Sequence, residues 1–374
     1  MTTPLQPLAG IRVLDFTAFP PGGFCTVVLA DLGAEIIRVE APAAKGKPSL
    51  VVGQVALSRG KRSLALDMRN PAANDVLQRL IKTVDVVVEN ARPGAMEAKG
   101  FGYSHAQALN PKIVWCAITG FGQQGPYAEH AGHDLSYLAH SGLLRALTGQ
   151  LPWQPDMPLA LQSGGLAAVI GIVTALFQSA RSGVGAHIDI SLSEASTWLL
   201  SGGINPLSDR PFAIPATPDR RLYACADGNF VAVASCEPRT WSALCNGLGL
   251  PELIDNLHKP AAAAATEQAI AEVIATRTAA DWVELLAPLG AAVTPVNHAS
   301  QLLQDPHIKA RSSIVECGGT PVPANPLRLQ TADGASTATA VEPPHRVGED
   351  TQEILAAAGF TAAELDALLS AGII

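Results

Sequence analysis

Residues 12–40 read RVLDFTAFPPGGFCTVVLADLGAEIIRVE, and this stretch decides the fold. Residues 12–16 are strand-like, and residues 23–33 place apolar side chains at helical spacing. A second strand-like run, residues 35–40, follows at once. The order strand, helix, strand predicts a βαβ unit, in which the two strands lie parallel in one sheet.

The same alternation continues through the first half of the chain. Further strand-like runs cover residues 63–67, 84–88, 113–119 and 186–192. Asn70 and Pro71 are residue types that favour the N-cap and the first position of a helix, so we expect a helix to start there. Residues 164–179 read as a buried helix. Apolar strands that alternate with helices predict an α/β, Rossmann-like domain with a mostly parallel sheet.

The pattern changes in the second half of the chain. Residues 221–235 alternate around Asp227-Gly228, which indicates an antiparallel hairpin with a tight turn, and prolines between 206 and 218 indicate a linker. Helical patterns and one short strand follow at residues 238–249, 264–277, 279–289 and 292–296, and a last helix is expected over 359–370. We therefore expect a large domain from residues 1–204, a linker over 205–220, a small α+β domain over 221–320, and a return segment over 321–374 that completes the large domain.

Composition limits the classes of partner. The 374 residues carry a net charge of −8, with a pI near 5.6, which argues against a nucleic-acid partner. The six cysteines lack metal-site spacing and the N-terminus lacks a signal pattern, so we expect free thiols, no metal and a cytoplasmic location. The longest apolar run, residues 164–180, is slightly short for a membrane span and rich in small residues. We expect a core helix there and no membrane partner.

The turn after the first strand does not match a dinucleotide site. Residues 17–23 read TAFPPGG and lack the GxGxxG pattern, whose glycines let the backbone approach a pyrophosphate. Pro20 and Pro21 also remove N–H donors from this turn. We therefore expect no NAD.

Cationic side chains gather where a ligand would bind. Arg38 lies near the end of a strand, Arg92 follows another strand, and residues 58–63 (SRGKRS) place three charges beside a glycine. Open α/β sheets bind ligands at the carboxyl ends of their strands, so we expect all three places on that edge. Guanidinium forks and ammonium groups suit phosphate esters. The alternative is ordinary solvated surface charge, and it is strongest for Lys61 and Arg62 taken singly.

Five blocks of sequence carry a resemblance to a known family. They are LADLGA (29–34), RVE (38–40), GKRSL (60–64), RPG (92–94) and AGHDLSYLA (131–139). With them the chain resembles, from residue 8 to its C-terminus, the class III CoA-transferase family and, within it, the α-methylacyl-CoA racemase branch. The resemblance implies coenzyme A as the handle of an acyl-CoA substrate, a large domain built from both chain ends, and an interlaced homodimer. The residues that it assigns to CoA are Arg38, Ser58, Arg59, Lys61, Arg62, Asn90 and Arg92.

The resemblance also implies a base. In the racemase-like members, the histidine that matches His133 exchanges the α-proton of the thioester, and backbone N–H groups near a helix start hold the enolate oxygen. Glu237 matches a glutamate that reaches this histidine from the small domain, where a carboxylate raises imidazole basicity. Each has a structural alternative, a capping or core histidine for His133 and an exposed helix-start acid before Pro238 for Glu237. Asp134 is expected to hold backbone donors at the same helix start as His133.

The sequence departs from the family at the second acid/base. The expected aspartate precedes a glycine-rich helix start, but here its position falls on Ala160 when the chain is anchored on Gly164-Gly165. Neighbouring registers offer Leu161 or Gln162, and none of these side chains transfers a proton. The CoA-transferases of the family carry a nucleophilic aspartate in the same region, so both standard mechanisms lose their carboxylate.

Three interpretations remain open. In the first, Asp156 moves in from the preceding loop and replaces the missing carboxylate. In the second, His133 is the only base of another enolate reaction, and Gln162 hydrogen-bonds the substrate. In the third, the chain binds CoA esters without turning them over. We rank first a racemase-like, enolising enzyme with His133, Glu237 and Asp156 as catalytic residues, with CoA transfer to a carboxylic acid and pure CoA-ester binding as the alternatives.

Overall fold

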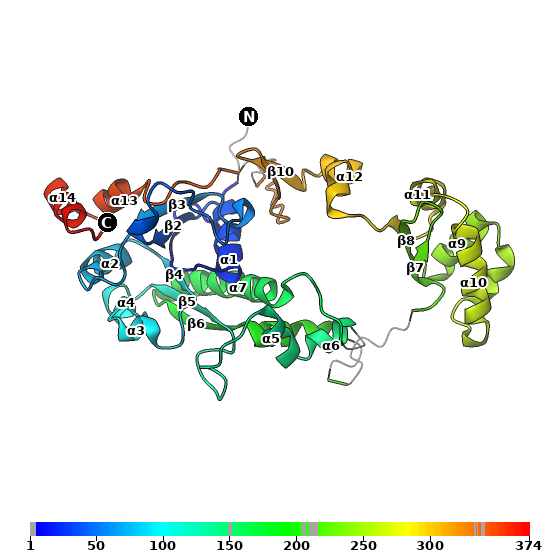
Figure 1. The fold of residues 1–374 in the computed structure, drawn as a ribbon, viewed down its shortest axis with the longest axis horizontal. Coiled ribbons are helices and arrows are strands. Elements are labelled where there is room, and N and C mark those ends of the chain that lie inside the picture. The colour runs from blue at the N-terminus through cyan, green and yellow to red at the C-terminus, as the bar shows by residue number, and fades with distance from the viewer. Residues whose placement is uncertain are drawn as a thin grey trace. The chain divides into compact units, whose positions relative to one another are not determined.

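The computed structural model describes residues 5–148, 152–203, 207–208, 216–332, 334, 336–337 and 341–374 (Figure 1). Contacts divide the chain into two compact units, unit 1 (Met1–Phe212 and Ala310–Ile374) and unit 2 (Ala213–Lys309). Both ends of the chain therefore belong to unit 1. Much of the expected linker, residues 205–220, lies outside the described residues. The domain boundaries drawn from the sequence stay a prediction.

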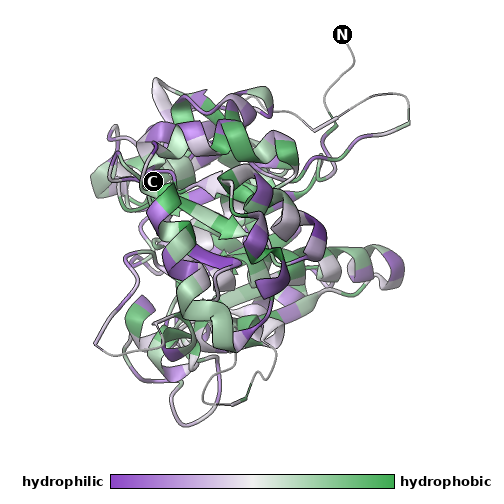
Figure 2. Cartoon of the chain, turned by 90° about the vertical axis from the view of Figure 1, so that its right-hand side faces the viewer, coloured by the Kyte–Doolittle hydropathy of each residue, from purple (hydrophilic) through white to green (hydrophobic). Residues whose placement is uncertain are grey.

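Unit 1 is built on a parallel sheet of six strands. In spatial order they are β3 (Lys61–Ala65), β2 (Glu35–Glu40), β1 (Arg12–Asp15), β4 (Val86–Glu89), β5 (Val114–Thr119) and β6 (Ala186–Ser191). The central strands carry the hydrophobic colour in Figure 2, whereas many helices carry both colours. The predicted α/β fold with a mostly parallel sheet is confirmed. Strand order reverses between β1 and β4, which makes their carboxyl ends the topological switch point of the sheet.

Helices cover both faces of this sheet, because neighbouring strand residues point to opposite sides. Val13 and Val114 belong to one buried cluster, and the adjacent Leu14 and Trp115 belong to another. The helices of unit 1 are α1 (Pro20–Asp31), α2 (Ala73–Ile81), α3 (Ala95–Ala98), α4 (Tyr103–Leu109), α5 (Asp134–His140), α6 (Leu143–Thr148), α7 (Leu159–Ser182), α8 (Leu192–Trp198), α13 (Thr351–Ala357) and α14 (Ala362–Ser370).

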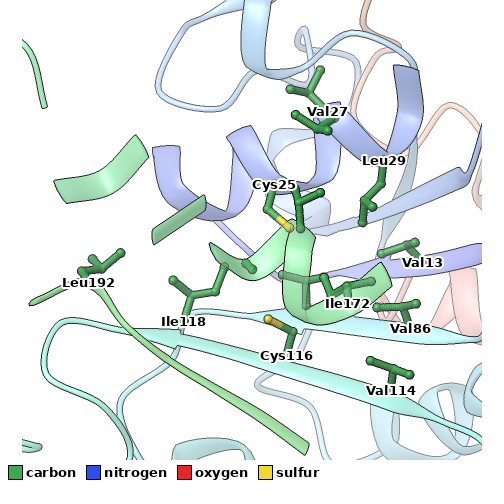
Figure 3. Close-up of a cluster of buried hydrophobic side chains, with 14 of the residues drawn as sticks. Val13, Cys25, Val27, Leu29, Val86, Val114, Cys116, Ile118, Ile172 and Leu192 are labelled. Carbon is green, nitrogen blue, oxygen red and sulfur yellow. The ribbon is translucent and has the colours of Figure 1, made fainter. Parts of the chain in front are cut away.

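Helices α1 and α7 lie on the first face. Cys25 of α1 and Ile172 of α7 pack with Val13 of β1 in one buried cluster (Figure 3). The two helices approach closely because α7 carries a glycine at their contact: a Cβ atom on Gly165 would lie 2.8 Å from the carbonyl oxygen of Pro21. The glycine-rich start of α7 therefore has a packing role beside α1.

The second face joins the two ends of the chain. Ile354 and Leu355 of α13 and the C-terminal Ile373 lie in the same buried cluster as Leu14 and Ile37 of the first two strands. One correction concerns α2, which begins at Ala73 and not at the predicted Pro71. The Asn70 side chain instead accepts the N–H of Ala72 in the turn that precedes the helix.

Helix α7 is longer than predicted and is not buried on every side. Leu166, Ile170 and Phe177 are 50%, 53% and 64% exposed. Within the described residues, α7 is the one helix long and apolar enough to cross a membrane by length and composition, a test that core helices of soluble proteins also pass. Its other side packs against α1, β5 and β6. The prediction of a buried helix is therefore right for one side of α7 and wrong for the other.

Unit 2 has a three-stranded sheet covered by helices. Strands β7 (Arg220–Ala224), β8 (Phe230–Ala234) and β9 (Val293–Pro295) pair antiparallel, and the helices are α9 (Pro238–Leu248), α10 (Ala263–Ile274) and α11 (Ala279–Leu286). The predicted hairpin is confirmed, and Gly228 takes the left-handed backbone conformation that its turn requires (φ 76°). Trp241 and Trp282 lie in the core of this unit. The return to unit 1 runs through α12 (Pro306–Ala310) and the antiparallel pair β10 (Ile314–Cys317) and β11 (Thr320–Pro323).

Candidate active site

The switch point of the sheet brings two loops together. The N–H of Phe16, just after β1, donates to the carbonyl of Val88 in β4 (2.9 Å), and the N–H of Ala18 reaches Oδ1 of Asn90 (3.4 Å). Arg92 follows on the same loop, and its exposed side chain makes no hydrogen bond or ion pair within the described part of the chain. The structure therefore leaves one predicted CoA residue, Arg92, with a free guanidinium at this edge.

Glu89 ends β4 and was not predicted as a site residue. Its carboxylate accepts the N–H of Ala91 (2.6 Å), which folds the turn that leads to Arg92. The side chain is almost fully buried, and burial raises the pKa of Glu89 to about 6. The available sequence signal was an acid at the end of an otherwise apolar run, residues 86–89 (VVVE).

Arg38 is held inside the unit. Its Nη1 donates to the Ser49 hydroxyl (3.1 Å) and lies 3.2 Å from the Glu40 carboxylate. Its Nε is buried and has no hydrogen-bond partner among the described residues. Arg38 therefore keeps one unused donor although its charge is already paired.

Ser58 and Arg59 have internal partners. The Ser58 hydroxyl accepts the N–H of Val51 (2.8 Å). Arg59 forms a two-pronged ion pair with Asp31 at the end of α1 (2.7 and 3.1 Å). Both side chains are buried, so in this chain they stabilise a loop and its contact with α1. Their assignment to CoA stays a prediction.

Lys61 and Arg62 begin β3, so the chain enters a strand here and does not leave one. This corrects the expectation that these residues lie at the carboxyl end of a strand, because they lie at the amino end of β3. The Lys61 ammonium is buried and donates to Thr26 (2.7 Å), 3.5 Å from the Asp15 carboxylate. Burial lowers the pKa of Lys61 to about 8, although Asp15 opposes the shift. The Arg62 guanidinium is surrounded by carboxylates, those of Glu35, Asp350 and Glu353.

His133 lies directly before α5, at the end of the loop that follows β5. Its backbone N–H donates to the Ser136 hydroxyl (3.3 Å), His133 and Ser136 form the capping box of α5, and the imidazole is exposed. The Tyr137 hydroxyl donates to the carbonyl of Gly132 (2.5 Å). A Cβ atom on Gly120 would lie 2.4 Å from the Tyr137 ring, so the glycine makes room for this clamp. The backbone before His133 is thus fixed, while its side chain is exposed at the start of α5.

Aromatic rings surround the same loop. Phe121 packs edge-on against Tyr127 and His140, and His130 lies beside Tyr127 at 4.6 Å between ring centroids. His140 also hydrogen-bonds the Ser193 hydroxyl through Nδ1 (2.7 Å). These contacts give His130 and His140 a packing role that the sequence could not separate from a surface role.

Asp134 connects α5 to α7. Its Oδ1 accepts the N–H of Leu161 in the first turn of α7 (3.0 Å). The expectation that Asp134 holds donors of its own helix start is corrected, because the donor belongs to α7. Burial raises the pKa of Asp134, and the hydrogen bonds from Leu161 and Ala160 oppose that shift.

This contact places the segment that lacks the family carboxylate next to the residue after His133. Ala160 is fully buried, whereas Gln162 is half-buried. Asp156 is exposed in the preceding loop and makes no hydrogen bond or ion pair with the rest of the described chain. The structure thus brings Asp134 to this segment and shows no contact that would bring Asp156 there.

Glu237 lies in unit 2, directly before α9. Its N–H donates to the Thr240 hydroxyl (3.3 Å), and its side chain is exposed. The pairing of Glu237 with His133 stays a prediction. Across the described residues, no group of three or more His, Cys, Asp or Glu side chains could hold a metal ion.

Comparison with known proteins identifies the family. The sequence matches the model of CoA-transferase family III over residues 8–351. The chain belongs to CoA-transferase family III. It is 34% identical to the human alpha-methylacyl-CoA racemase, over 98% of this chain and 97% of that protein. It is also 34% identical to the succinyl-CoA–D-citramalate CoA-transferase of Chloroflexus aurantiacus, over 83% and 84% of the two chains.

Solved structures agree with this family III assignment. A hypothetical protein of Mycobacterium tuberculosis superposes with a TM-score of 0.80 at 27% identity, over 94% of this chain and all (100%) of that chain. A CaiB/BaiF family protein of Brucella suis gives 0.79 at 28% identity, over 94% and 99%. The resemblance found in the sequence is confirmed. Since the relatives are acyl-CoA racemases and CoA-transferases, this family III chain is an enzyme that acts on acyl-CoA, and CoA fits as the handle of its substrate.

The buried Glu89 carboxyl predicts a pH-dependent stability difference. Its pKa of about 6 in the native chain lies above the ordinary value of 4.5, so the unfolded chain loses this proton first as the pH rises. Native stability therefore falls between pH 4.5 and about 6, by about 2 kcal/mol at most. Glu89→Gln keeps an acceptor for Ala91 and carries no charge. We expect urea unfolding to show Glu89→Gln more stable than the native chain near pH 7, with the gain lost near pH 4.

The exposed Glu316→Gln serves as the control, because it removes a carboxylate of unit 1 without changing a buried charge. An equal difference between Glu89→Gln and the native chain at both pH values would contradict the assignment of a desolvated carboxyl.

Proposed function

We propose that the chain is an α-methylacyl-CoA racemase-like enzyme that removes the α-proton of a CoA thioester with His133 as the base. The observation that carries the proposal is the exposed imidazole at the fixed start of α5, beside a segment that has no carboxylate nucleophile at residues 160–162. The similarity to racemases over almost the whole chain supports it.

The chemistry follows from the thioester. Its carbonyl makes the α-proton acidic, and abstraction leaves an enolate whose oxygen needs hydrogen-bond donors. Backbone N–H groups in the first turn of a helix have no helical acceptor, and α5 offers such groups beside His133. The resemblance pairs Glu237 with this histidine, and a carboxylate beside an imidazole would raise its basicity.

The CoA handle is assigned to the switch point. Arg92 offers an unpaired guanidinium there, Asn90 lies two residues before it, and Arg38 has one unused buried donor. Four further predicted residues already have partners inside unit 1, namely Ser58, Arg59, Lys61 and Arg62. We therefore propose that Arg92 makes the main contact with a CoA phosphate. The other four residues would contribute indirectly, by stabilising the fold of unit 1.

CoA transfer to a carboxylic acid is the alternative that the relatives favour, since several of them carry transferase names. It requires a nucleophile, and the residues at the expected place are Ala160, Leu161 and Gln162. Movement of labelled CoA from a thioester to a free carboxylate, with trapping of a protein acyl group by hydroxylamine, would establish transfer.

We also propose that the chain works as an interlaced homodimer. The exposed side of α7 is an apolar stripe, formed by Leu166, Ile170, Val173 and Phe177, that would be costly to leave in water. A second copy of the chain is the occupant that the family resemblance implies.

A cytoplasmic location is proposed on the free cysteines, which form no disulfide in the described chain.

Replacement of His133 tests the enolisation. His133→Ala removes the proposed base, so deuterium uptake at the α-carbon of a 2-methylacyl-CoA in heavy water should fall by about 10²–10⁴-fold. Mass spectrometry of the recovered ester measures it. His105→Ala, a surface histidine that contacts Glu97, is the matched control and should exchange at the native rate. Native protein that binds the ester without any exchange would instead support a pure binding role.

Replacement of Arg92 tests the CoA assignment. A charge-assisted hydrogen bond to phosphate contributes about 1.5–3 kcal/mol, so Arg92→Ala should weaken CoA-ester binding roughly 10–100-fold. Because CoA does not react, KM should rise while kcat changes little. Calorimetry with CoA and steady-state kinetics measure the two effects. Arg69→Ala, an exposed arginine paired with Asp67, should leave both unchanged, and equal effects of the two variants would contradict the assignment.

A charged substitution on the exposed side of α7 tests the proposed homodimer. Phe177→Glu places a carboxylate on the apolar stripe, so sedimentation should show a monomer where the native chain shows a dimer. Leu369→Glu, at a comparably exposed apolar position on α14, is the control and should stay dimeric. A native chain that sediments as a monomer at micromolar concentration would contradict the homodimer.

A further inference from the structure

Racemisation needs two proton-transferring groups, because the proton leaves one face of the α-carbon and returns to the other. His133 supplies one. Across residues 152–162 the only carboxylate is Asp156, which is exposed and has no contact that directs it to the site. A second group would have to come from another element, and a hydrogen bond joins one carboxylate of α5 to the first turn of α7.

We propose that Asp134 is the second acid/base of this site. The proposal rests on the enolisation proposed above and adds a residue to it. Asp134 follows His133 directly, and its carboxylate is bonded to the N–H of Leu161 (3.0 Å), in the segment where the family carboxylate is missing. A carboxyl group held there could take the place of the family carboxylate that residues 160–162 lack.

The surroundings of Asp134 suit proton transfer. Within the described residues its carboxylate has no ion-pair partner, so no cation fixes it in the ionised form. Partial burial raises the pKa of Asp134 and brings its acid form closer to neutral pH. The side chain is half-buried, so part of it stays open to solvent.

The proton balance closes without another reactant. The neutral His133 imidazole takes the α-proton, which breaks the C–H bond and leaves an imidazolium and an enolate. The protonated Asp134 carboxyl then gives its proton to the opposite face of the α-carbon and becomes a carboxylate. The other enantiomer runs the same steps in reverse, and solvent water restores the protonation of both groups between turnovers.

The alternative is a purely structural role, in which Asp134 only caps the start of α7. Asparagine separates the two roles, because its amide oxygen still accepts the Leu161 N–H but the amide does not transfer a proton at neutral pH. Asp134→Asn should therefore keep the fold and the affinity for CoA esters. If Asp134 is only a cap, its activity should also stay native.

The experiment follows each enantiomer of a 2-methylacyl-CoA separately in heavy water, with chiral analysis of the product. We expect Asp134→Asn to lose interconversion of the enantiomers by at least about 10²-fold, while one enantiomer still exchanges its α-proton with retention through His133. Asp366→Asn, at an exposed aspartate of α14 outside the site, is the matched control and should racemise at the native rate. Native racemisation in Asp134→Asn, or its loss in Asp156→Asn, would overturn the assignment.

The two proposals fail differently. If the native enzyme exchanges neither enantiomer, the enolisation itself is wrong and the assignment of Asp134 falls with it. If the native enzyme racemises and Asp134→Asn does so equally well, only Asp134 is excluded. Thermal unfolding of Asp134→Asn beside the native chain checks that loss of interconversion does not come from loss of the fold.

Discussion

A buried charge at the end of β1 organises the large unit. The Asp15 carboxylate accepts hydrogen bonds from the backbone and hydroxyl of Thr17 and from the Thr26 hydroxyl, at 2.6 to 2.8 Å, and Lys61 lies 3.5 Å away. All of these groups are buried. Removing one partner of such a pair leaves an uncompensated charge in the core, which typically costs about 3–5 kcal/mol. The turn after β1 is thus held by side chains.

This use of charge inside the unit decides which cations remain for a ligand. Arg59 and Arg62 are paired with carboxylates of other elements, so the anionic CoA handle has to compete with those carboxylates for them. Arg92 has no such competitor within the described chain. The net charge of −8 alone would not predict an anion site. A guanidinium without an ion-pair partner at the switch point of the sheet nevertheless attracts an anionic ligand locally.

The sequence predicts what depends on local pattern and misses what depends on distant partners. Residues 35–40 form the expected strand because alternation and β-branched content act within the segment. Asp31 and Arg59 are 28 positions apart, and nothing local to either predicts their ion pair. Residues 164–179 are apolar around the whole helix, so the pattern cannot separate the side that meets α1 from the side left exposed. The sequence predicts Asp134 as a cap of its own helix, because the sequence does not show that α7 begins beside it.

The missing carboxylate affects acyl transfer and proton transfer, the two reactions of the family, to different degrees. A nucleophile must reach the carbonyl carbon along one direction of attack, so no group on a neighbouring element replaces it easily. A proton passes from any acid within hydrogen-bond reach, directly or through one water. The contact between Asp134 and Leu161 brings a carboxyl group to the start of α7 without restoring a side chain at residues 160–162. This difference is the reason why we propose proton transfer at the α-carbon ahead of acyl transfer.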